Sequence, residues 1–331
     1  MFNRWASVAI AFVIDQDPAV NWLLESEDPS IIYLTRKEIL GEDDSELVQI
    51  RRKIPSGPKV RALLSGQRPD GGFGVHPYRK WTGSHWRLVS LVQLSIPADN
   101  KSARKAAREV ANWLSRALQK STSTAGEYPR KHASIYGNAL GTLSYLGMAH
   151  DRRVRLIAES LINWQWPDGR WNCDPNPSAR HSSFYESLST LWGLTIFHRE
   201  TGGRQVSNAV ERASELFLRH RLFRSHRGEK VANSQWLKLH YPLYWHYDVL
   251  QALNVLSLSG RLSDPRVSEA LDIVERKRTR ERFWIAEGFY WHPVTGARSG
   301  STDVVDWGRK GPNQMISLNA LRVLKASGRL R

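Results

Sequence analysis

The sequence contains a single cysteine, Cys173, in 331 residues. No disulfide can therefore form within the chain, which suits a protein of the reducing cytosol. No apolar run approaches the ~20 residues that a membrane-spanning helix needs. A shorter apolar run at residues 6–14 is followed by Asp15 and Asp17 without a small-residue cleavage site, so we do not expect a signal peptide. We expect a cytoplasmic protein.

Acidic residues are scarce relative to basic ones. The chain has 32 Asp and Glu against 48 Lys and Arg, a formal net charge of +16. Such a charge attracts phosphates, an acidic membrane face or nucleic acid, and a solvated basic surface explains it equally well. The densest basic patch, residues 275–282, mixes charge signs, and no zinc-finger or RNA-binding signature accompanies it. Nucleic acid is therefore not the expected partner.

Fingerprints of nucleotide cofactors are also missing, because the glycine-containing turns match neither a P-loop nor a dinucleotide motif. Aromatic residues, in contrast, are abundant, with 14 Trp, 10 Tyr and 9 Phe. The hydrophobic share of 41% and the charged share of 24% are typical of a globular protein. Some aromatic rings must pack between elements, and others could line a cavity for an apolar or sugar-like ligand.

One pattern of leucines recurs five times along the chain. Each copy places three leucines three residues apart, and successive copies begin 48 to 68 residues apart. The other faces of each copy are also rich in small and apolar residues, which is typical of a helix buried on more than one side. The copies predict five inner helices at residues 88–94, 140–146, 188–194, 250–256 and 318–324.

Amphipathic stretches with one charged face alternate with these copies. Each predicts an outer helix with a dry stripe and a wet face. They lie at residues 59–65, 106–119, 152–165, 205–222 and 265–277. Residues 19–40 add further helical segments. We predict an all-α protein of about five to six helix pairs, with an N-terminal helical segment (1–58) packed on one continuous repeat domain (59–331).

Two nearly identical heptads lie in loops between these helices, 98 residues apart. Residues 67–73 read QRPDGGF, and residues 165–171 read QWPDGRW. Pro and Asp-Gly favour a tight turn. We expect the Gln amide to bond nearby backbone and the last aromatic ring to fill the seam between repeats. Weaker versions lie at residues 126–128 and 288–291.

These heptads resemble the QW motif, Q-x-x-D-G-x-W, of squalene–hopene cyclases, and the alternating helices are similar to the β subunits of protein prenyltransferases. The resemblance covers residues 59–328. It implies the α/α toroid of the terpenoid-cyclase and prenyltransferase superfamily, in which a ring of inner helices surrounds a central cavity. It also implies an isoprenoid or other apolar ligand in an aromatic-lined cavity, with acid-catalysed cyclisation or prenyl transfer as the reaction.

The catalytic motifs of that superfamily have no full counterpart in this chain. The string from Asp303 to Asp306 is nearest to the Asp-x-Asp-Asp acid of class II terpene cyclases, but its spacing differs and its centre is valine. Residues 42–44 are the nearest to the acidic magnesium site of class I synthases. Cys173 directly precedes Asp174, unlike the Asp-x-Cys zinc pair of protein prenyltransferases. The resemblance therefore predicts the fold better than the reaction.

We expect the starts of the inner helices to face the mouth of the toroid, and polar residues gather at these starts, where helix dipoles favour anions. If the helices form a ring, these residues converge. A histidine stands at four of the five starts: His85, His132, His181 and His246. Histidine suits acid–base chemistry near neutral pH, and histidine with carboxylates also suits a divalent metal. Any one of these residues could instead cap a helix.

The favoured pair is His246 with Asp248, in the aromatic-rich string YWHYD at residues 244–248. The candidate catalytic residues are Asp248, His246, Asp303, Asp306 and Glu186. The candidate ligand-binding residues are His85, Trp86, Arg87, His132, Tyr136, His181, Tyr185, Trp245 and Tyr247. A diphosphate would be held by Arg87, Arg130 or Lys310. We assign no role to Cys173, because no base is adjacent to it in the sequence.

Three functions fit these observations. The first is a cyclase- or prenyltransferase-like protein, which requires an elongated apolar cavity. The second is a carbohydrate-active enzyme, a glycoside hydrolase or polysaccharide lyase, which requires an open polar groove with paired carboxylates. The third is a non-catalytic scaffold or binding protein. The expected partner is a small apolar or anionic molecule; a membrane surface and a divalent metal stay open.

Overall fold

The computed structural model describes residues 16–120, 128–179, 183–225, 228, 230–293 and 302–330. These residues form helices, loops and isolated bridges, with no β-strand among them, so the predicted all-α class is confirmed. No helix in this part of the chain combines the length and the apolar character that crossing a membrane requires. Residues 6–14, the weak heptad at 126–127 and His181 lie outside the described residues.

The N-terminal part consists of short helices, of which α2 (Pro18–Leu24) and α3 (Pro29–Leu34) begin with proline. Asp17 caps α2 and Asp28 caps α3, each by accepting a backbone N–H from the first turn. The next elements are the π-helical segment η1 (Thr35–Leu40), α4 (Asp44–Lys53), the 3₁₀ turn η2 (Ile54–Ser56) and α5 (Pro58–Leu64). The helices α2, α3 and η1 all contact the last helix of the chain, α14 (Gln314–Ala326).

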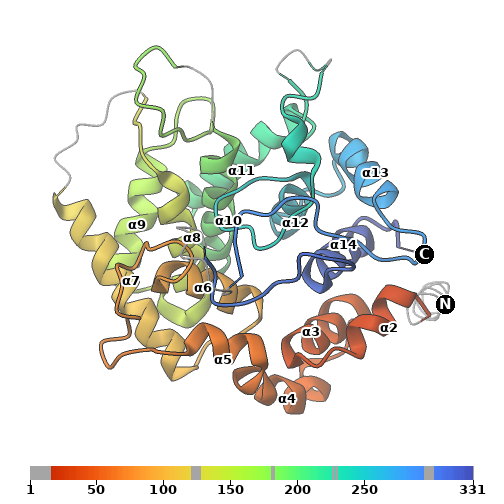
Figure 1. Cartoon of the computed structure of the whole chain (residues 1–331). Helices are drawn as coiled ribbons and strands as arrows, with labels where there is room; N and C mark the ends of the chain where they lie inside the picture. The colour runs from red at the N-terminus through yellow and green to blue at the C-terminus, as the bar shows by residue number, and fades with distance from the viewer. Residues whose placement is uncertain are drawn as a thin grey trace, which may run out of the picture.

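The five leucine-rich copies are the five most buried helices. In α6, for example, every residue from Ser84 to Val92 is buried. Each helix of this inner series contacts the next one, and together they occupy the middle of the molecule (Figure 1). The series consists of α6 (Ser84–Gln93), α8 (Ala133–Leu143), α10 (Phe184–Thr201), α12 (Val249–Leu258) and α14. Burial on all faces explains why these helices lack a charged side.

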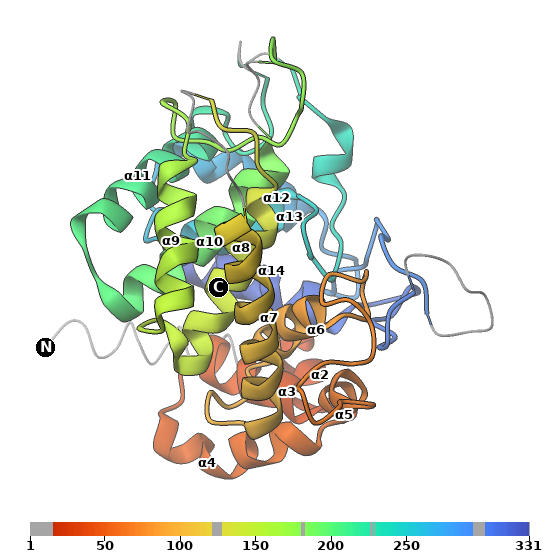
Figure 2. The ribbon, with the colours of Figure 1, turned by 90° about the vertical axis from the view of Figure 1, so that its left-hand side faces the viewer.

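The amphipathic stretches form the outer series, which bury one stripe each. Figure 2 shows α7 and α9 running alongside α8, and each of these three helices contacts the other two. The outer helices are α7 (Lys101–Lys120), α9 (Arg152–Asn163), α11 (Arg204–Arg219) and α13 (Ser268–Arg276), which follows the 3₁₀ turn η5 (Pro265–Val267). The π-helical segment η3 (Ser144–Met148) and the 3₁₀ turn η4 (Ser234–Leu237) complete the described elements.

The helices α8 and α10 approach each other most closely, and glycine makes this possible. A Cβ atom on Gly137 would lie 2.5 Å from the Cα atom of Thr190. A Cβ atom on Gly193 would meet the carbonyl oxygen of Gly137, so the two helices interlock at a pair of glycines. Because no side chain fits between the backbones, substitution at either glycine must push the helices apart.

The two heptads fold into the same hydrogen-bonded turn. Gln67 Nε2 donates to the carbonyls of Gly71 (3.0 Å) and of Ser102 on α7 (2.9 Å). Gln165 Nε2 donates in the same way to the carbonyls of Gly169 (2.8 Å) and of Ala209 on α11 (2.9 Å). Each turn is thus tied to the next outer helix, as the expected role of the Gln amide requires.

A third copy of this turn lies at residues 278–284, in the basic patch RTRERFW. Thr279 N donates to Phe283 O (2.7 Å), as Trp166 N does to Arg170 O (2.8 Å). Arg282 has φ of +75°, where Gly71 and Gly169 have +95° and +92°. The sequence shows no glutamine or Pro-Asp-Gly there, so the residue types did not predict a heptad at this position.

The ring nitrogens of the last heptad residues confirm this equivalence. Trp171 Nε1 donates to Leu161 O (2.8 Å) and Trp284 Nε1 to Val274 O (2.7 Å), in both cases on the preceding outer helix. Both rings are buried, so they fill the seam between repeats as expected. Phe73 is only partly buried and lies under the guanidinium of Arg87, 4.0 Å from its ring centroid.

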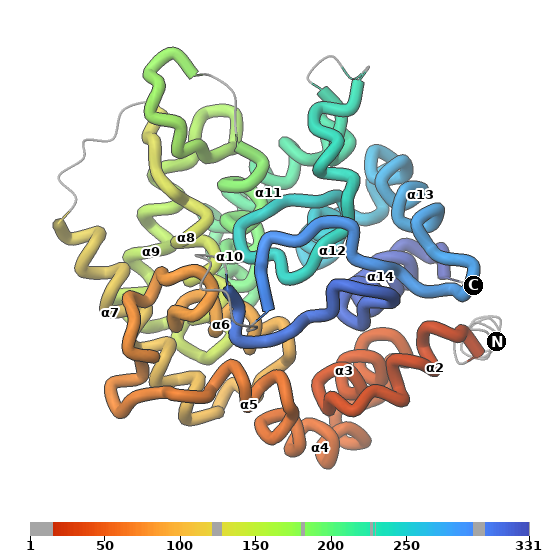
Figure 3. Tube along the Cα trace, viewed as in Figure 1, coloured from red at the N-terminus to blue at the C-terminus, as the bar shows by residue number. Residues whose placement is uncertain are grey.

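Two long loops cross in front of the inner helices (Figure 3). The segment at 238–248 precedes α12, and the segments at 284–293 and 302–313 precede α14. The two loops lie side by side, because Glu287 N donates to Leu239 O (2.8 Å) and His240 bridges to Gly288. They cover the end of the inner series where α12 and α14 begin.

Candidate functional site

A cavity of about 570 Å³ lies between the inner helices. Residues of α6, α8, α10, α12 and α14 line its wall, together with Leu34 and Glu38 from the N-terminal part. Its volume falls in the usual range for sites that bind small molecules. Aromatic side chains contribute to the lining, namely Tyr145, Trp192, Tyr241 and Tyr244. The lining is therefore the mixture of aliphatic, aromatic and amide groups that a mainly apolar ligand requires.

The two ends of the cavity differ in exposure. At the end where α12 begins, Tyr241, Tyr244 and Gln251 are at most 2% exposed, and the crossing loop at 238–248 closes this end. At the opposite end, where the inner helices finish, Arg199 is exposed and Ser257 is half-buried. The cavity thus opens toward the C-terminal ends of the inner helices and not toward their starts, where we had expected the mouth.

Charged groups occur only near the open end of the described lining. Arg199 Nη2 donates to the carbonyl of Leu258 (2.5 Å), which leaves its other nitrogens to face solvent or a ligand. Arg322 forms an ion pair with Glu38 and donates to Asn319 Oδ1 (2.6 Å). With two arginines and one carboxylate, this end carries a net positive charge.

Several amide groups in the wall have a polar atom without a hydrogen-bond partner among the described residues. These atoms are Gln93 Oε1, Gln251 Nε2 and Asn254 Oδ1. A buried polar atom without a partner costs free energy, so water or a ligand must satisfy these atoms. The wall therefore offers both donors and acceptors to a molecule in the cavity.

Of the candidate catalytic and ligand-binding residues that the structure describes, His246 alone lines the cavity. Its ring is stacked between those of Trp245 and Tyr290, with centroids 4.0 and 3.5 Å away. Burial lowers the pKa of His246 to about 3. An imidazole with so low a pKa is a weak base at neutral pH. His246 is therefore better placed to fix the loop and to contact a ligand than to act as a base.

Asp248, the favoured partner of His246, lies behind the cavity wall. Its carboxylate caps α12 by accepting Gln251 N (2.9 Å) and also accepts His240 N (2.9 Å). His240 Nδ1 lies 2.8 Å from Asp248 Oδ2, and both side chains are fully buried. Asp248 therefore organises the start of α12, and it pairs with His240, which the sequence did not single out.

Asp303 is connected to the cavity through one intermediate group. Its carboxylate accepts the Tyr244 hydroxyl, Trp307 Nε1 (2.9 Å) and the backbone N–H of Val304 (2.6 Å). The carboxyl is fully buried, and this burial raises its pKa. Since Tyr244 lines the cavity, Asp303 reaches a ligand only through that hydroxyl. Asp306, in contrast, is exposed and caps the backbone N–H of Gly308 (2.9 Å).

The residues at the start of α6 are buried among the helices and do not line the cavity. Arg87 donates to the carbonyls of Thr82 (2.7 Å), Leu63 (2.9 Å) and Ser65 (3.0 Å), and burial lowers its pKa to about 10. These bonds use Nε and Nη1 to hold the end of α5, so the guanidinium is not free to bind a diphosphate with both of its terminal nitrogens. Trp86 Nε1 donates to Tyr78 O (2.8 Å). His85 is buried, neither ring nitrogen has a partner in the described structure, and burial lowers its pKa to about 3.

The remaining aromatic candidates also pack between elements. The Tyr247 hydroxyl donates to Leu222 O (2.5 Å), and the Tyr185 hydroxyl accepts Trp236 Nε1 (3.3 Å). Tyr136 packs edge-on against Trp164, and Trp245 stacks on His246. Of the other cations, Arg130 bonds the loop carbonyls of Asp174, Pro177 and Ala179, and Lys310 is exposed. Their roles in ligand binding stay predictions.

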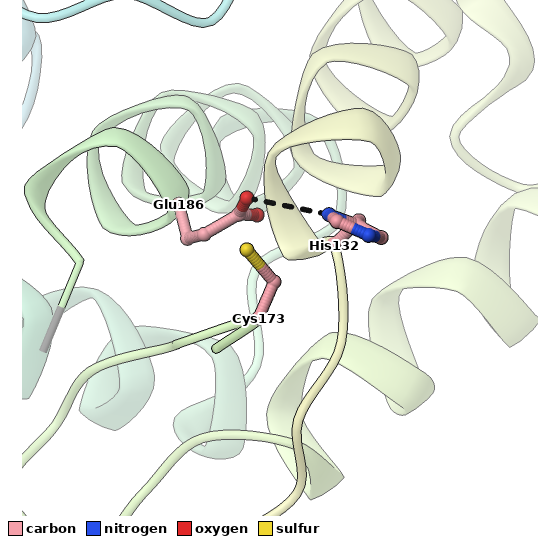
Figure 4. Close-up of side chains that lie close together, drawn as sticks. All are labelled: His132, Cys173 and Glu186. Carbon is pink, nitrogen blue, oxygen red and sulfur yellow. Dashed lines mark ion pairs between the residues drawn. The ribbon is translucent and has the colours of Figure 1, made fainter. Parts of the chain in front are cut away.

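A separate group of side chains meets at the starts of α8 and α10. His132, Cys173 and Glu186 each direct a potential metal ligand toward the other two (Figure 4). His132 Nδ1 lies 3.8 Å from Glu186 Oε1, and the carboxylate raises the pKa of the imidazole. Burial, and then the same carboxylate, raises the pKa of the Cys173 thiol to about 12. His132 and Glu186 thus converge as expected, and they do so with Cys173, to which we had assigned no role.

The sequence did contain a signal for the cavity residues. Polar side chains follow the first leucine of three copies by one position: Ser189, Gln251 and Asn319. The residues at four positions after that leucine also line the cavity in four copies: Val92, Trp192, Asn254 and Arg322. Positions one and four share one face of a helix. Polar residues on that face of otherwise apolar helices indicated a solvent- or ligand-filled centre.

No protein-family model matches the chain, and no curated protein matches it. The geometry described above therefore carries the functional argument by itself.

Proposed function

We propose that the inner helices close into the ring of an α/α toroid, as the QW-like heptads imply. The contacts of α14 with α2 and α3 support this closure. The third heptad supports it further: Arg278 takes the position of Gln67 and Gln165, and it bonds Asp17 at the start of α2. In the other two heptads this position bonds the next outer helix, so α2 stands where the outer helix after α13 is expected.

The proposed function is the binding of a mainly apolar small molecule with an anionic end in the central cavity. An isoprenoid diphosphate has this chemistry. The single observation that carries the proposal is the asymmetry of the cavity, with Tyr241 and Tyr244 at the closed end and Arg199 at the open end. Apolar surface would be buried deep in the cavity, while the phosphate groups stay near the guanidinium groups and water.

The lining favours binding over acid-catalysed cyclisation. Glu38 supplies the one carboxylate among the described lining residues, and it is paired with Arg322. A cyclisation acid must reach the substrate, and the buried Asp303 could act only through the Tyr244 hydroxyl. The paired carboxylates of a glycoside hydrolase have no counterpart in this lining, so the carbohydrate alternative is less favoured.

The test is a calorimetric titration of the purified protein with farnesyl diphosphate, farnesol and inorganic diphosphate. We expect the diphosphate ester to bind more tightly than either of the other two, because it alone uses both ends of the cavity. Ser189→Trp should abolish binding by filling the cavity. Arg199→Gln should lower the affinity for the diphosphate ester by at least about tenfold, in line with the loss of a hydrogen bond to a charged group. The affinity for farnesol should not change.

Ser45→Trp, at an exposed position of α4, is the matched control for the bulky substitution. Equal affinity of the wild-type protein and Ser189→Trp would place any binding outside the cavity and overturn the proposal. Binding of an acidic oligosaccharide in place of the isoprenoids would support the carbohydrate alternative. If neither isoprenoids nor oligosaccharides bind, the non-catalytic scaffold alternative is favoured.

A further inference from the structure

The cluster of His132, Cys173 and Glu186 lies outside the cavity lining and has no part in the proposed ligand binding. One ligand atom of each side chain lies within 4.8 Å of the others. The three residues come from three segments: the N-terminal end of α8, the loop after the second heptad, and the first turn of α10 (Figure 4). Figure 4 shows the thiol directed toward the carboxylate of Glu186, with the imidazole of His132 on the other side of that carboxylate's ion pair.

Backbone contacts hold these segments in place. Arg130 bridges to Asn172, and Lys131 N donates to Asn172 O (3.0 Å), so the residues just before His132 and Cys173 are paired. Glu186 Oε2 accepts Ser134 N (2.7 Å), which orients the carboxylate and leaves Oε1 directed at His132. Ligands supported in this way need little reorganisation to bind an ion.

The separation of His132 and Glu186 is close to that of two ligands of a tetrahedral ion. Around Zn²⁺ with ordinary bond lengths, ligand atoms are separated by about 3.4 Å for N and O and about 3.6 Å for S and O. The 3.8 Å between His132 Nδ1 and Glu186 Oε1 is too long for a hydrogen bond but close to that separation. The His132 side chain is 70% exposed, so its ring can turn the remaining few tenths of an ångström freely.

We propose that His132, Cys173 and Glu186 bind one Zn²⁺ ion, whose fourth coordination position is open to water. One thiolate, one imidazole and one carboxylate form a donor set that suits a borderline-soft ion such as zinc better than it suits magnesium or calcium. Binding replaces the thiol proton of Cys173, which leaves to solvent, by the metal–sulfur bond.

The experiment uses full-length protein freed of metal by a chelator and titrated with Co²⁺, followed by competition with Zn²⁺. Thiolate coordination to Co²⁺ gives a near-ultraviolet charge-transfer band, and a tetrahedral site gives intense visible bands. Because Cys173 is the one cysteine of the chain, a thiolate band identifies it directly. We expect one ion per chain, loss of the charge-transfer band in Cys173→Ser, and affinity at least about tenfold lower in His132→Ala.

His150→Ala, at another exposed histidine, is the matched control and should bind as the wild type does. Glu186→Gln keeps an oxygen for Ser134 N and should also lower the affinity. Circular dichroism of each variant separates lost ligation from lost folding. A Co²⁺ complex without the charge-transfer band, or equal zinc affinity in Cys173→Ser, would overturn the proposal. Neither result depends on the cavity ligand.

Discussion

Arg278 Nη2 lies 2.5 Å from both carboxylate oxygens of Asp17, although the two residues are 261 positions apart. The side chains are only 13% and 4% exposed. Arg278 Nε also donates to Arg282 O (2.8 Å), so one side chain shapes the third heptad turn and fastens it to the first described helix. This ion pair joins the third heptad turn to the N-terminal helices.

Arg278→Ala should lower the free energy of unfolding by about 3–5 kcal/mol, because it removes the close partner of a buried carboxylate and leaves only Arg282 Nη2, 3.8 Å from Asp17 Oδ2. Urea denaturation measures the change. Arg261→Ala removes an exposed pair with Glu211 (3.2 Å) and should cost only about 0–1 kcal/mol. In a double-mutant cycle, the double variant Asp17→Asn/Arg278→Gln should lose less stability than the sum of the losses of the two single variants. Full additivity would show that the pair does not couple the third heptad turn to α2.

Arg282→Gly should stabilise the protein by up to about 1 kcal/mol, because Arg282 adopts a φ of +75° that glycine adopts without strain. The equivalent positions of the other heptads are Gly71 and Gly169. Thermal unfolding is the measurement, with Arg282→Ala as the control that keeps the strain. A gain in stability for the alanine variant as well would attribute the effect to charge and not to the backbone.

Gly169→Ala should destabilise the protein more than Gly66→Ala does. Both residues have positive φ, but a Cβ atom on Gly169 would lie 2.5 Å from Arg212 O, whereas nothing lies within 4 Å of one on Gly66. Gly66→Ala should therefore cost about 1 kcal/mol from the backbone alone, and Gly169→Ala several times as much. Similar losses in chemical denaturation would contradict the close approach of the second heptad to α11.

The stability of the protein should fall as the pH drops from about 6 to 4. Burial lowers the pKa of His85 to about 3, below its unfolded value of 6.5, so the unfolded chain binds a proton that the folded one excludes. The contribution of His85 to the free energy of unfolding is at its full value above the pKa of the unfolded chain. Below that pKa it decreases by roughly 1 kcal/mol per pH unit. His85→Leu should flatten this slope in urea titrations at several pH values, and the exposed His150→Leu should not.

The inner helices were predictable because their signal is local. Leucines at a spacing of three, with Gly141, Gly193 or Ala252 on other faces, determine a helix buried all round before any partner is known. The third heptad was not predictable in the same way. Its turn is built from backbone hydrogen bonds and a positive φ at Arg282, and the residue types Arg, Thr and Glu are not typical of such a turn.

The sequence predicted part of the candidate site. The sequence indicated that polar residues converge, and His132 with Glu186 do so. It placed the mouth at the helix starts, whereas the cavity is closed there by Tyr241 and Tyr244. Loop paths across an end of the helices depend on tertiary packing, because no local periodicity specifies where a loop of irregular conformation runs.

Periodicity and side-chain size act within a few residues of one another, so the sequence was sufficient to predict an all-α chain of alternating buried and amphipathic helices. Packing of the whole fold was needed to bring Arg278 to Asp17, to enclose a cavity between the polar faces of α10, α12 and α14, and to place Cys173 beside His132 and Glu186. These meetings depend on the angles at which helices pack and on the paths of the loops between them, which are properties of the whole fold.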